Sequence, residues 1–328
     1  MNVLAGDVGG TKTLLRIASD EGEVLASQRF ESAKYAHLSV MVAELLAAHA
    51  GAERPKIAAF GVAGPVVDGA SKTTNLPWQL EEKALARACE LDRVKLMNDF
   101  EATAYGVLEL PPEGLATLQV GSAATRGMIT VIGAGTGLGE AFVVRGDHPG
   151  EEQVVASEGG HADFAPRDDL EIELLRYLRT RYGRVSWERV VSGHGIANVY
   201  EFLRDTKVVV ESPDVARELS SQDVGAVIGK HALAGDDALC MRTIDLFLAS
   251  YGAEAGNLAL KGLATGGVYV TGGIAPKLLP LLKGGSFLRS YRDKGRLSSV
   301  VERSPVHVVL DQETPLRGAM RVALRMGR

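Results

Sequence analysis

The chain has 328 residues, of which 46% are hydrophobic and 23% charged, a balance typical of soluble globular proteins. Its net charge of −5 offers no basic surface for nucleic acid or an anionic membrane, and its two cysteines, Cys89 and Cys240, cannot build a disulfide framework or a cysteine zinc site. No signal peptide and no membrane-spanning apolar run is visible, so we expect a cytoplasmic protein.

The first predicted element is a glycine-containing hairpin at "GDVGGTKT", residues 6–13. This stretch approaches the phosphate-binding P-loop, but Thr11 stands where that loop requires its second glycine. A P-loop also leads into a helix, whereas "LLRIAS" continues as a strand and "EGEVLASQRF" adds a third. We therefore predict strand, glycine turn and strand instead of a P-loop.

Further along, the pattern predicts a helix near 37–49, a strand in "KIAAFGVAG", a helix around 80–90, a strand in "RVKLMNDF" and a helix from about 101. The turn-rich "LPPEG" at 110–114 is the best domain boundary. "MITVIGAGTGLGEAFVV", at 128–144, then repeats the strand, glycine turn and strand. Placing Gly6 on Gly133 predicts two domains of related architecture.

The second half is mostly helical from 169, with a long buried helix within 236–262 and a strand ending at Gly272-Gly273. A final strand, "VHVVLD", and a helix follow. "GAGTGLG" is not the dinucleotide fingerprint, because Leu138 stands at its third glycine and a strand follows it.

The glycine turns predict a phosphate site. Successive backbone N–H groups in such turns attract anions, and two matched turns plus Gly272-Gly273 favour this function over ordinary hairpins. Asp7 lies in the first turn, where an acid would repel phosphate unless a cation lay between them. Asp7 is therefore predicted on the Mg²⁺ side.

Five polar residues are candidates for binding a hydroxyl-rich ligand. Asp99, after Asn98 at the end of a strand, is placed either to accept a proton from a hydroxyl or to cap the next helix. Glu158 and His161 in "SEGGHADF" and Glu188 in "SWERVV" could add hydrogen bonds. Taken singly, each of these three is better explained by an ordinary loop or first-turn helix role.

In combination, these segments resemble bacterial-type glucokinases of the hexokinase–actin–chaperone ATPase superfamily. The resemblance covers nearly the whole chain through "GDVGGT", "NDFEA", "GAGTGLG", "EGGH.DF", "ERV.SG.G", "GNLAL" and "GGI.P". It implies an α/β, two-lobed ribonuclease-H-like (actin-like ATPase) fold with an interdomain active-site cleft. Residues 1–109 with 303–328 would form the small domain and residues 110–302 the larger one.

The same resemblance implies ATP-dependent phosphorylation of glucose, with Mg²⁺ held by Asp7 through water, and a homodimer. Asp99 would be the general base for the 6-hydroxyl. Glucose would be bound by Asn98, Asp99, Glu158, His161 and Glu188. ATP would be bound by Gly6, Asp7, Val8, Gly9, Gly10, Thr11, Gly133, Gly135, Thr136, Gly137, Gly272 and Gly273.

Three alternatives stay open. The substrate could be another hexose, such as mannose, fructose or an N-acetylated amino sugar, and the donor could be ADP or polyphosphate. A non-catalytic sugar-binding regulator is disfavoured by Asp99, and a DNA-binding repressor by the five residues that precede Gly6. Nothing like the cysteine-rich zinc cluster of the related repressor/kinase family follows His161. Lys12 is compatible with a phosphate contact or with a solvated surface position.

Overall fold

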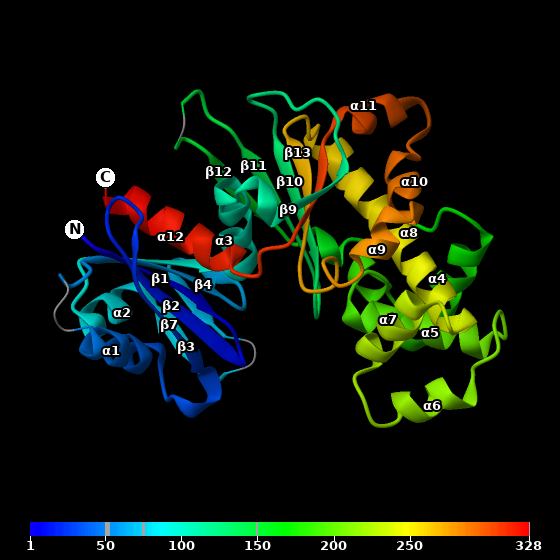
Figure 1. Cartoon of the computed structure of the whole chain (residues 1–328), viewed down its shortest axis with the longest axis horizontal. Helices are drawn as coiled ribbons and strands as arrows, with labels where there is room; N and C mark the ends of the chain where they lie inside the picture. Colours follow the sequence, from blue (N-terminus) through cyan, green and yellow to red (C-terminus); the bar gives the residue numbers. More distant parts are fainter. Residues whose placement is uncertain (50–52, 74–75, 149, 328) are drawn as a thin grey trace. The chain divides into compact units, whose positions relative to one another are not determined.

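The structure, a computed structural model, describes residues 1–49, 53–73, 76–148 and 150–327 and contains two compact units (Figure 1). Unit 1 comprises Met1–Glu113, His148–Val155 and Asp311–Arg328, and unit 2 comprises Gly114–Asp147 and Ala156–Leu310. These bounds differ from the predicted domains, 1–109 with 303–328 and 110–302. The differences arise because the strand at Val306–Val309 pairs within unit 2, while the segment from His148 belongs to unit 1.

Unit 1 is built on a five-stranded sheet in the order β3-β2-β1-β4-β8. β1, β4 and β8 run parallel, and β2 is antiparallel to both β1 and β3. A second sheet of the unit has the order β5-β6-β7. The strands of unit 1 are β1 (Val3–Val8), β2 (Lys12–Ala18), β3 (Val24–Glu31), β4 (Ile57–Val62), β5 (Val66–Val67), β6 (Ala70–Lys72), β7 (Gln79–Glu81) and β8 (Arg93–Asn98).

The opening segment forms the predicted hairpin and not a P-loop. Val8 at the end of β1 lies opposite Thr13 in β2, and no helix follows the turn. Gly6 lies within β1, where a Cβ would come 2.5 Å from Cδ1 of Phe60. Glycine is required at this position for packing between β1 and β4, since no larger side chain fits beneath the phenyl ring.

Helices cover both faces of the first sheet: α1 and α2 lie on one side, and α3 and α12 on the other (Figure 1). Residues of β1 therefore alternate between two apolar layers, with Leu4 facing α1 and α2, and Val3 facing α3 and α12. The second helix begins later than predicted because Gln79–Glu81 pairs with β6. The helices are α1 (Leu38–Ala48), α2 (Glu82–Cys89), α3 (Asp99–Gly106) and α12 (Thr314–Gly327), with 3₁₀ turns η1 (Ser32–Lys34), η2 (Val107–Glu109) and η3 (Pro112–Gly114).

The sheet of unit 2 repeats this arrangement. Its order is β12-β11-β10-β13-β14-β9, in which β10 and β11 form a hairpin and β13 and β14 run parallel to β10. The first five strands thus repeat the order of unit 1, which confirms the predicted recurrence. The strands of this sheet are β9 (Leu115–Gln119), β10 (Ile129–Ala134), β11 (Leu138–Val144), β12 (Gln153–Ser157), β13 (Gly267–Thr271) and β14 (Val306–Val309). The first three residues of β12 fall in the segment assigned to unit 1.

The two hairpins match residue by residue, although not in the predicted alignment. In both, a strand of 6 residues is followed by three turn residues and a strand of 7. Val8 therefore corresponds to Ala134, and Gly6 corresponds to Ile132 and not to Gly133. The prediction was out by one residue because it aligned glycines that serve different purposes: Gly6 is needed for packing inside its strand.

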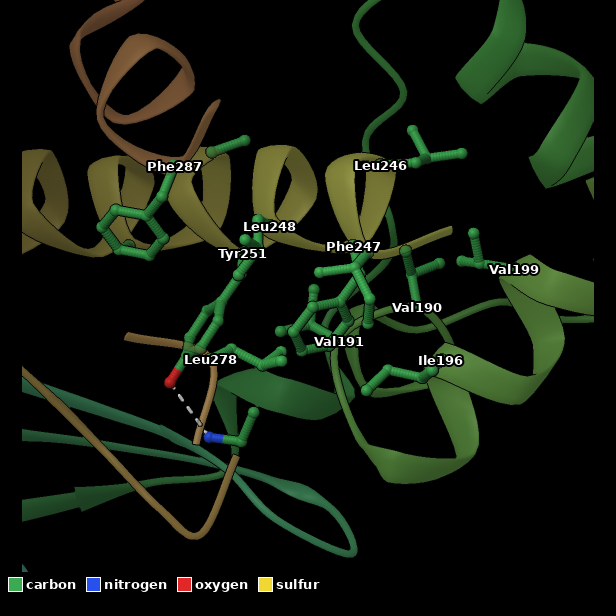
Figure 2. Close-up of a cluster of buried hydrophobic side chains, with 14 of the residues drawn as sticks. Val190, Val191, Ile196, Val199, Leu246, Phe247, Leu248, Tyr251, Leu278 and Phe287 are labelled. Carbon is green, nitrogen blue, oxygen red and sulfur yellow. Dashed lines mark hydrogen bonds between the residues drawn. The ribbon is translucent and has the colours of Figure 1, made fainter. Parts of the chain in front are cut away.

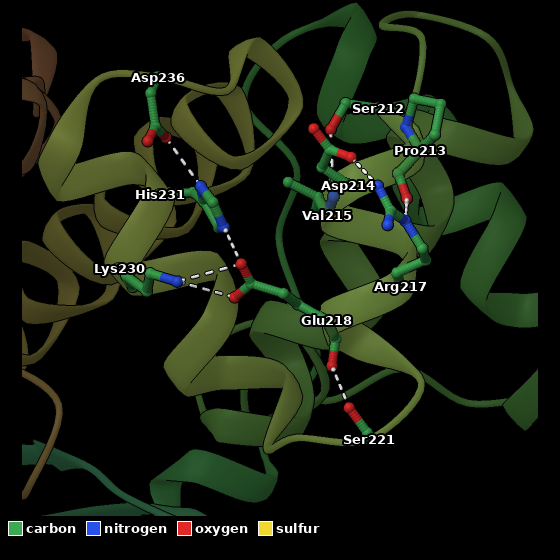
Figure 3. Close-up of polar contacts among 10 residues, drawn as sticks. All are labelled: Ser212, Pro213, Asp214, Val215, Arg217, Glu218, Ser221, Lys230, His231 and Asp236. Atoms are coloured by element: carbon green, nitrogen blue, oxygen red, sulfur yellow. Dashed lines mark hydrogen bonds and ion pairs between the residues drawn. The ribbon is translucent and has the colours of Figure 1, made fainter.

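The helices of unit 2 pack around α8, which is buried along most of its length as predicted (Figure 2). Lys230 of α7 forms an ion pair with Glu218 of α6, which is also contacted by the partly buried His231 (Figure 3). An ion pair with an exposed lysine contributes only about 0–1 kcal/mol to stability. None of the described helices is long and apolar enough to cross a membrane. The helices are α4 (Asp169–Tyr182), α5 (Gly193–Asp205), α6 (Pro213–Leu219), α7 (Val224–Ala234), α8 (Ala238–Gly262), α9 (Leu279–Lys283), α10 (Ser286–Arg292) and α11 (Ser298–Arg303), with 3₁₀ turns η4 (Gly159–His161), η5 (Trp187–Arg189) and η6 (Gly295–Leu297).

Candidate active site

In unit 1, the predicted phosphate turn and the predicted base lie at the same edge of the sheet. Val8, Val62 and Asn98, which end the parallel strands β1, β4 and β8, are in register with one another. The turn residues Gly9–Thr11 follow the first of these strands, and Asp99 follows the third. Ligands of open α/β sheets bind at this carboxyl edge, so its polar residues are placed to act on a bound molecule.

Asn98 is the N-cap of α3, and Asp99 is the first residue of that helix. Oδ1 of Asn98 accepts hydrogen bonds from the N–H of Phe100 (2.8 Å) and Glu101 (3.4 Å), while its Nδ2 donates to the carbonyl of Gly64 (3.1 Å). Oδ1 of Asp99 accepts from the N–H of Phe100 (2.9 Å). The capping role that the sequence left open for Asp99 therefore belongs mainly to its neighbour, Asn98.

Asp7 and Asp99 influence each other electrostatically. Burial, together with the negative charge of Asp99, raises the pKa of Asp7 to about 6. Mg²⁺ prefers oxygen ligands and uses one or two carboxylates together with water and substrate phosphates. This acidic edge fits such an ion. Among the residues that the structure describes, no three His, Cys, Asp or Glu side chains gather closely enough to hold a metal ion by themselves.

The other two predicted phosphate turns meet in unit 2. β10 and β13 are parallel neighbours, with Gly133 opposite Thr271, so the turns after them leave the sheet side by side. The carbonyl of Ala134 accepts a hydrogen bond from the N–H of Ile274 (3.4 Å). Gly272 adopts a left-handed φ of 85°, and its Cα lies so close to the carbonyl of Ala134 that a Cβ would not fit.

Two other turn glycines, Gly135 and Gly273, are not required by steric contacts or by backbone conformation. Among the residues that the structure describes, no atom lies within 4 Å of a Cβ placed on Gly135 or on Gly273, and neither glycine has a left-handed φ. Neither the backbone conformation nor packing against the protein therefore demands glycine at these positions. An open backbone in a glycine turn leaves room for a phosphate or ribose to approach the N–H groups directly.

Glu188 reaches the second hairpin. Its Oε2 accepts a hydrogen bond from the N–H of Leu138 (3.0 Å) and occupies the space that a Cβ on Gly137 would need. The Oγ of Ser192 donates to the carbonyl of Glu188 (2.7 Å), which fixes the backbone of η5. The predicted sugar residue thus stands beside the predicted phosphate turn, and its second carboxylate oxygen can serve a ligand.

Glu158 and His161 lie next to Glu188. Glu158 is the N-cap of the short helix η4 and His161 is its last residue, and the N–H of His161 donates to the carbonyl of Glu158 (3.0 Å). The N–H of Trp187, in η5, donates to the carbonyl of Ala162 (2.9 Å) and joins the two segments. The five predicted sugar residues therefore form two groups: Asn98 and Asp99 in unit 1, and Glu158, His161 and Glu188 in unit 2. Both Glu158 and His161 are exposed.

Glu140 is a residue of this region that sequence reasoning missed. It is 2% exposed, and neither of its carboxylate oxygens has a hydrogen-bond partner in the described part of the chain. Its Oε2 fills the position of a Cβ on Gly159, so the carboxyl group supports the backbone between Glu158 and His161. Burial and the charge of Glu254 raise its pKa to about 7. The signal in the sequence was a glutamate on the core-facing side of an apolar strand.

Solved structures define the class of this fold. The crystal structure of a glucokinase from an Antarctic psychrotroph superimposes with a TM-score of 0.86 at 30% identity and covers 98% of both chains. That of a ROK family glucokinase from Streptomyces griseus gives a TM-score of 0.63 at 20% identity, over 98% of this chain and 99% of its own. The chain has the actin-like ATPase fold of sugar kinases, as predicted.

Sequence relatives narrow the class further. The glucokinase of Trichormus variabilis is 44% identical over 99% of both chains, and that of Synechocystis sp. is 43% identical over 97% of both. The family model described as Glucokinase matches residues 4–326. The chain therefore belongs to the glucokinase family, which confirms the resemblance inferred from the sequence.

Proposed function

We propose that this hexose kinase transfers the γ-phosphoryl group of ATP to the 6-hydroxyl of D-glucose, giving glucose 6-phosphate and ADP. Membership of the glucokinase family supports this reaction. The observation that carries the assignment of roles is the pairing of Asp7 and Asp99 at the carboxyl edge of the first sheet, beside the turn Gly9–Thr11. One acid of the pair faces the phosphates, and the other acts on the sugar.

The glycine turns would bind ATP. Gly10 and Thr11 in unit 1, and Thr136 and Gly137 in unit 2, would present backbone N–H groups to the phosphates. The N–H groups of Gly9 and Gly135 donate to the carbonyls of Lys12 (3.0 Å) and Gly137 (2.9 Å), so these two glycines would shape the turns and leave room for the phosphates. Gly272 and Gly273 lie on the nucleoside side. The remaining predicted residues, Gly6, Val8 and Gly133, lie inside strands and support the turns through the backbone. Asp7 would hold Mg²⁺ through water, and the bound ion would neutralise charge on the phosphates.

Asp99 would act as the general base. It accepts the proton of the 6-hydroxyl as the oxygen attacks the terminal phosphorus. Glu158, His161, Glu188 and Asn98 would hold the other hydroxyls, each by hydrogen bonds that a sugar lacking that hydroxyl cannot make.

Alignment of the reactants outweighs the proton transfer. Holding hydroxyl and γ-phosphate in line supplies roughly 7–11 kcal/mol. A general base supplies about 10²–10⁴-fold, or roughly 3–5 kcal/mol. Removing the Asp99 carboxylate should therefore slow turnover strongly without abolishing the binding of either substrate.

The test is a coupled kinase assay of the wild type and of Asp99→Asn, with Glu101→Gln, an acid in the same helical turn, as the control. We expect Asp99→Asn to lower kcat at least ~10²-fold with glucose binding within about tenfold of wild type, and Glu101→Gln to keep near-normal turnover. His161→Ala should raise KM for glucose more than KM for ATP. Near-native turnover of Asp99→Asn would remove this residue from the base role.

The same assay decides the substrate range. A panel of glucose, mannose, fructose and N-acetylglucosamine, each with ATP, ADP and polyphosphate, should show the highest kcat/KM for glucose with ATP. Preference for another pair would replace the proposed substrates. We also infer a cytoplasmic homodimer, and light scattering on the purified chain tests the dimer.

A further inference from the structure

The buried hydroxyl of Tyr251 contacts backbone groups at the ends of the two strands that lead into the turns Gly135–Gly137 and Gly272-Gly273 (Figure 2). Tyr251, on α8, is 0% exposed. Its Oη accepts a hydrogen bond from the N–H of Ala134 (3.0 Å) and lies 3.4 Å from the carbonyl oxygen of Ile132 and 3.3 Å from that of Thr271. One side chain thus contacts the last residues of both β10 and β13.

The positions of these partners matter because each strand leads directly into a turn. Ala134 precedes Gly135, the first residue of the second phosphate turn, and Thr271 precedes Gly272. The paired register of β10 and β13 stops at Gly133 and Thr271. Where this pairing ends, the two segments are connected by the hydrogen bond from the N–H of Ile274 to the carbonyl of Ala134 and by the hydroxyl of Tyr251.

The aromatic ring is held by its neighbours. Phe287 meets it edge-on with the ring centres 5.5 Å apart, and Phe247 lies 5.8 Å away. Burial raises the pKa of Tyr251, so the hydroxyl keeps its proton and can both donate and accept. Its one proton serves the carbonyls of Ile132 and Thr271, while a lone pair receives the N–H of Ala134.

We propose that Tyr251 is a positioning residue that fixes the spacing between the turn Gly135–Gly137 and the turn Gly272-Gly273, and thereby the affinity for ATP. This inference rests on the proposed function, in which both turns bind the nucleotide. Phosphates and nucleoside are parts of one rigidly connected ligand. A change in the distance between the turns therefore weakens contacts at one end or the other.

Tyr251→Phe removes only the hydroxyl oxygen and leaves the ring in place. Tyr291→Phe is the matched control: Tyr291 is also fully buried in this core, and its hydroxyl donates to the carbonyl of Val301 (3.2 Å) in α11, outside both turns. Both variants lose a buried hydrogen bond and should melt at lower temperature than the wild type. They differ in the contacts that are lost: the hydroxyl of Tyr251 contacts the ends of β10 and β13, whereas that of Tyr291 contacts the carbonyl of Val301 in α11.

We expect Tyr251→Phe to raise KM for ATP, and Kd for ADP by calorimetry, by roughly 3- to 10-fold, the effect of losing one hydrogen bond. KM for glucose should change less than about twofold. Tyr291→Phe should leave all three constants at wild-type values. The inference is overturned if Tyr251→Phe binds nucleotide as the wild type does, or if both variants weaken binding equally.

The proposed function fails separately. If the wild-type protein neither binds ADP nor phosphorylates glucose, the assignment of the turns is wrong regardless of the variants. If the wild type does both and Tyr251→Phe changes neither nucleotide constant, only the positioning role is lost.

Discussion

Gly135 shows how a single residue can be explained by a ligand rather than by the fold. The space where its Cβ would lie is empty, and its φ is one that any residue adopts. Alanine at such a position normally stabilises a protein slightly, because it restricts the unfolded chain. The glycine is therefore best explained by the approach of the nucleotide to the backbone.

Gly135→Ala should separate these two requirements. We expect the free energy of unfolding to stay within about 0.5 kcal/mol of wild type or to rise, while KM for ATP increases at least roughly tenfold, because the methyl group obstructs the phosphate. Urea denaturation and steady-state kinetics measure the two effects. Gly225→Ala in α7, also without a close contact at its Cβ, is the control for a surface glycine. Unchanged KM for ATP in Gly135→Ala would argue against phosphate binding at this turn.

At the scale of elements, β11 carries an acid in its buried face. The pKa of Glu140 is raised from 4.5 to about 7, so the folded protein binds this proton more tightly than the unfolded chain does. The stability associated with the neutral carboxyl group is complete below pH 4.5 and is lost as the pH rises to about 7. Glu254 and Lys261 of α8 face the same group, with opposite effects on its pKa.

Glu140→Gln should remove this pH dependence, since an amide has no charge at any pH. Between pH 5 and pH 8 we expect the stability of the variant to improve relative to wild type by up to about 3 kcal/mol, the equivalent of the shift in pKa. Urea midpoints at both pH values measure the difference. If the difference in urea midpoint between Glu140→Gln and the wild type is the same at pH 5 as at pH 8, Glu140 does not titrate in this range.

Local elements were predictable where their signal is local. Glycine turns between alternating strands predicted both hairpins, and continuous apolar spacing predicted α8. Contacts between distant residues were not predictable: the bond from Leu138 to Glu188 joins positions 50 residues apart. Asn98 and Asp99 are both residue types that cap helices, so the sequence does not decide which of them is the N-cap of α3. The structure shows that it is Asn98. Tyr251 was missed because most residues of its helix are buried and the tyrosine lies in an apolar stretch, so nothing in the local sequence marks its hydroxyl as the group that reaches the two turns.

At the scale of the molecule, unit 1 depends on a helix far from its sheet in sequence. α12 places Leu316, Ala319 and Ala323 on the face formed by Val3, Ala5 and other residues of the parallel strands. The core of unit 2 draws on no residue of α12. Unit 1 therefore needs α12 for its core, whereas unit 2 does not.

A chain ending at Glu313 should therefore lose unit 1 and retain unit 2. Burial of Leu316 alone is worth roughly 2 kcal/mol, and an apolar face covered only by α3 leaves the sheet unstable. Limited proteolysis with mass spectrometry should show early cuts within 1–113 and resistant segments within 114–147 and 156–310. Protection of 1–113 equal to that in the complete chain would contradict this dependence.

The same dependence has a consequence for synthesis. The ribosome completes β1, β4 and β8 early, but it must make all of unit 2 before it reaches α12. During that interval one side of the apolar sheet of the nascent protein is covered by α3 alone, and its exposed apolar surface can bind chaperones or aggregate. Slower expression at low temperature should therefore increase the soluble yield of this kinase. A stop codon before Thr314 would remove α12 from the sheet of unit 1.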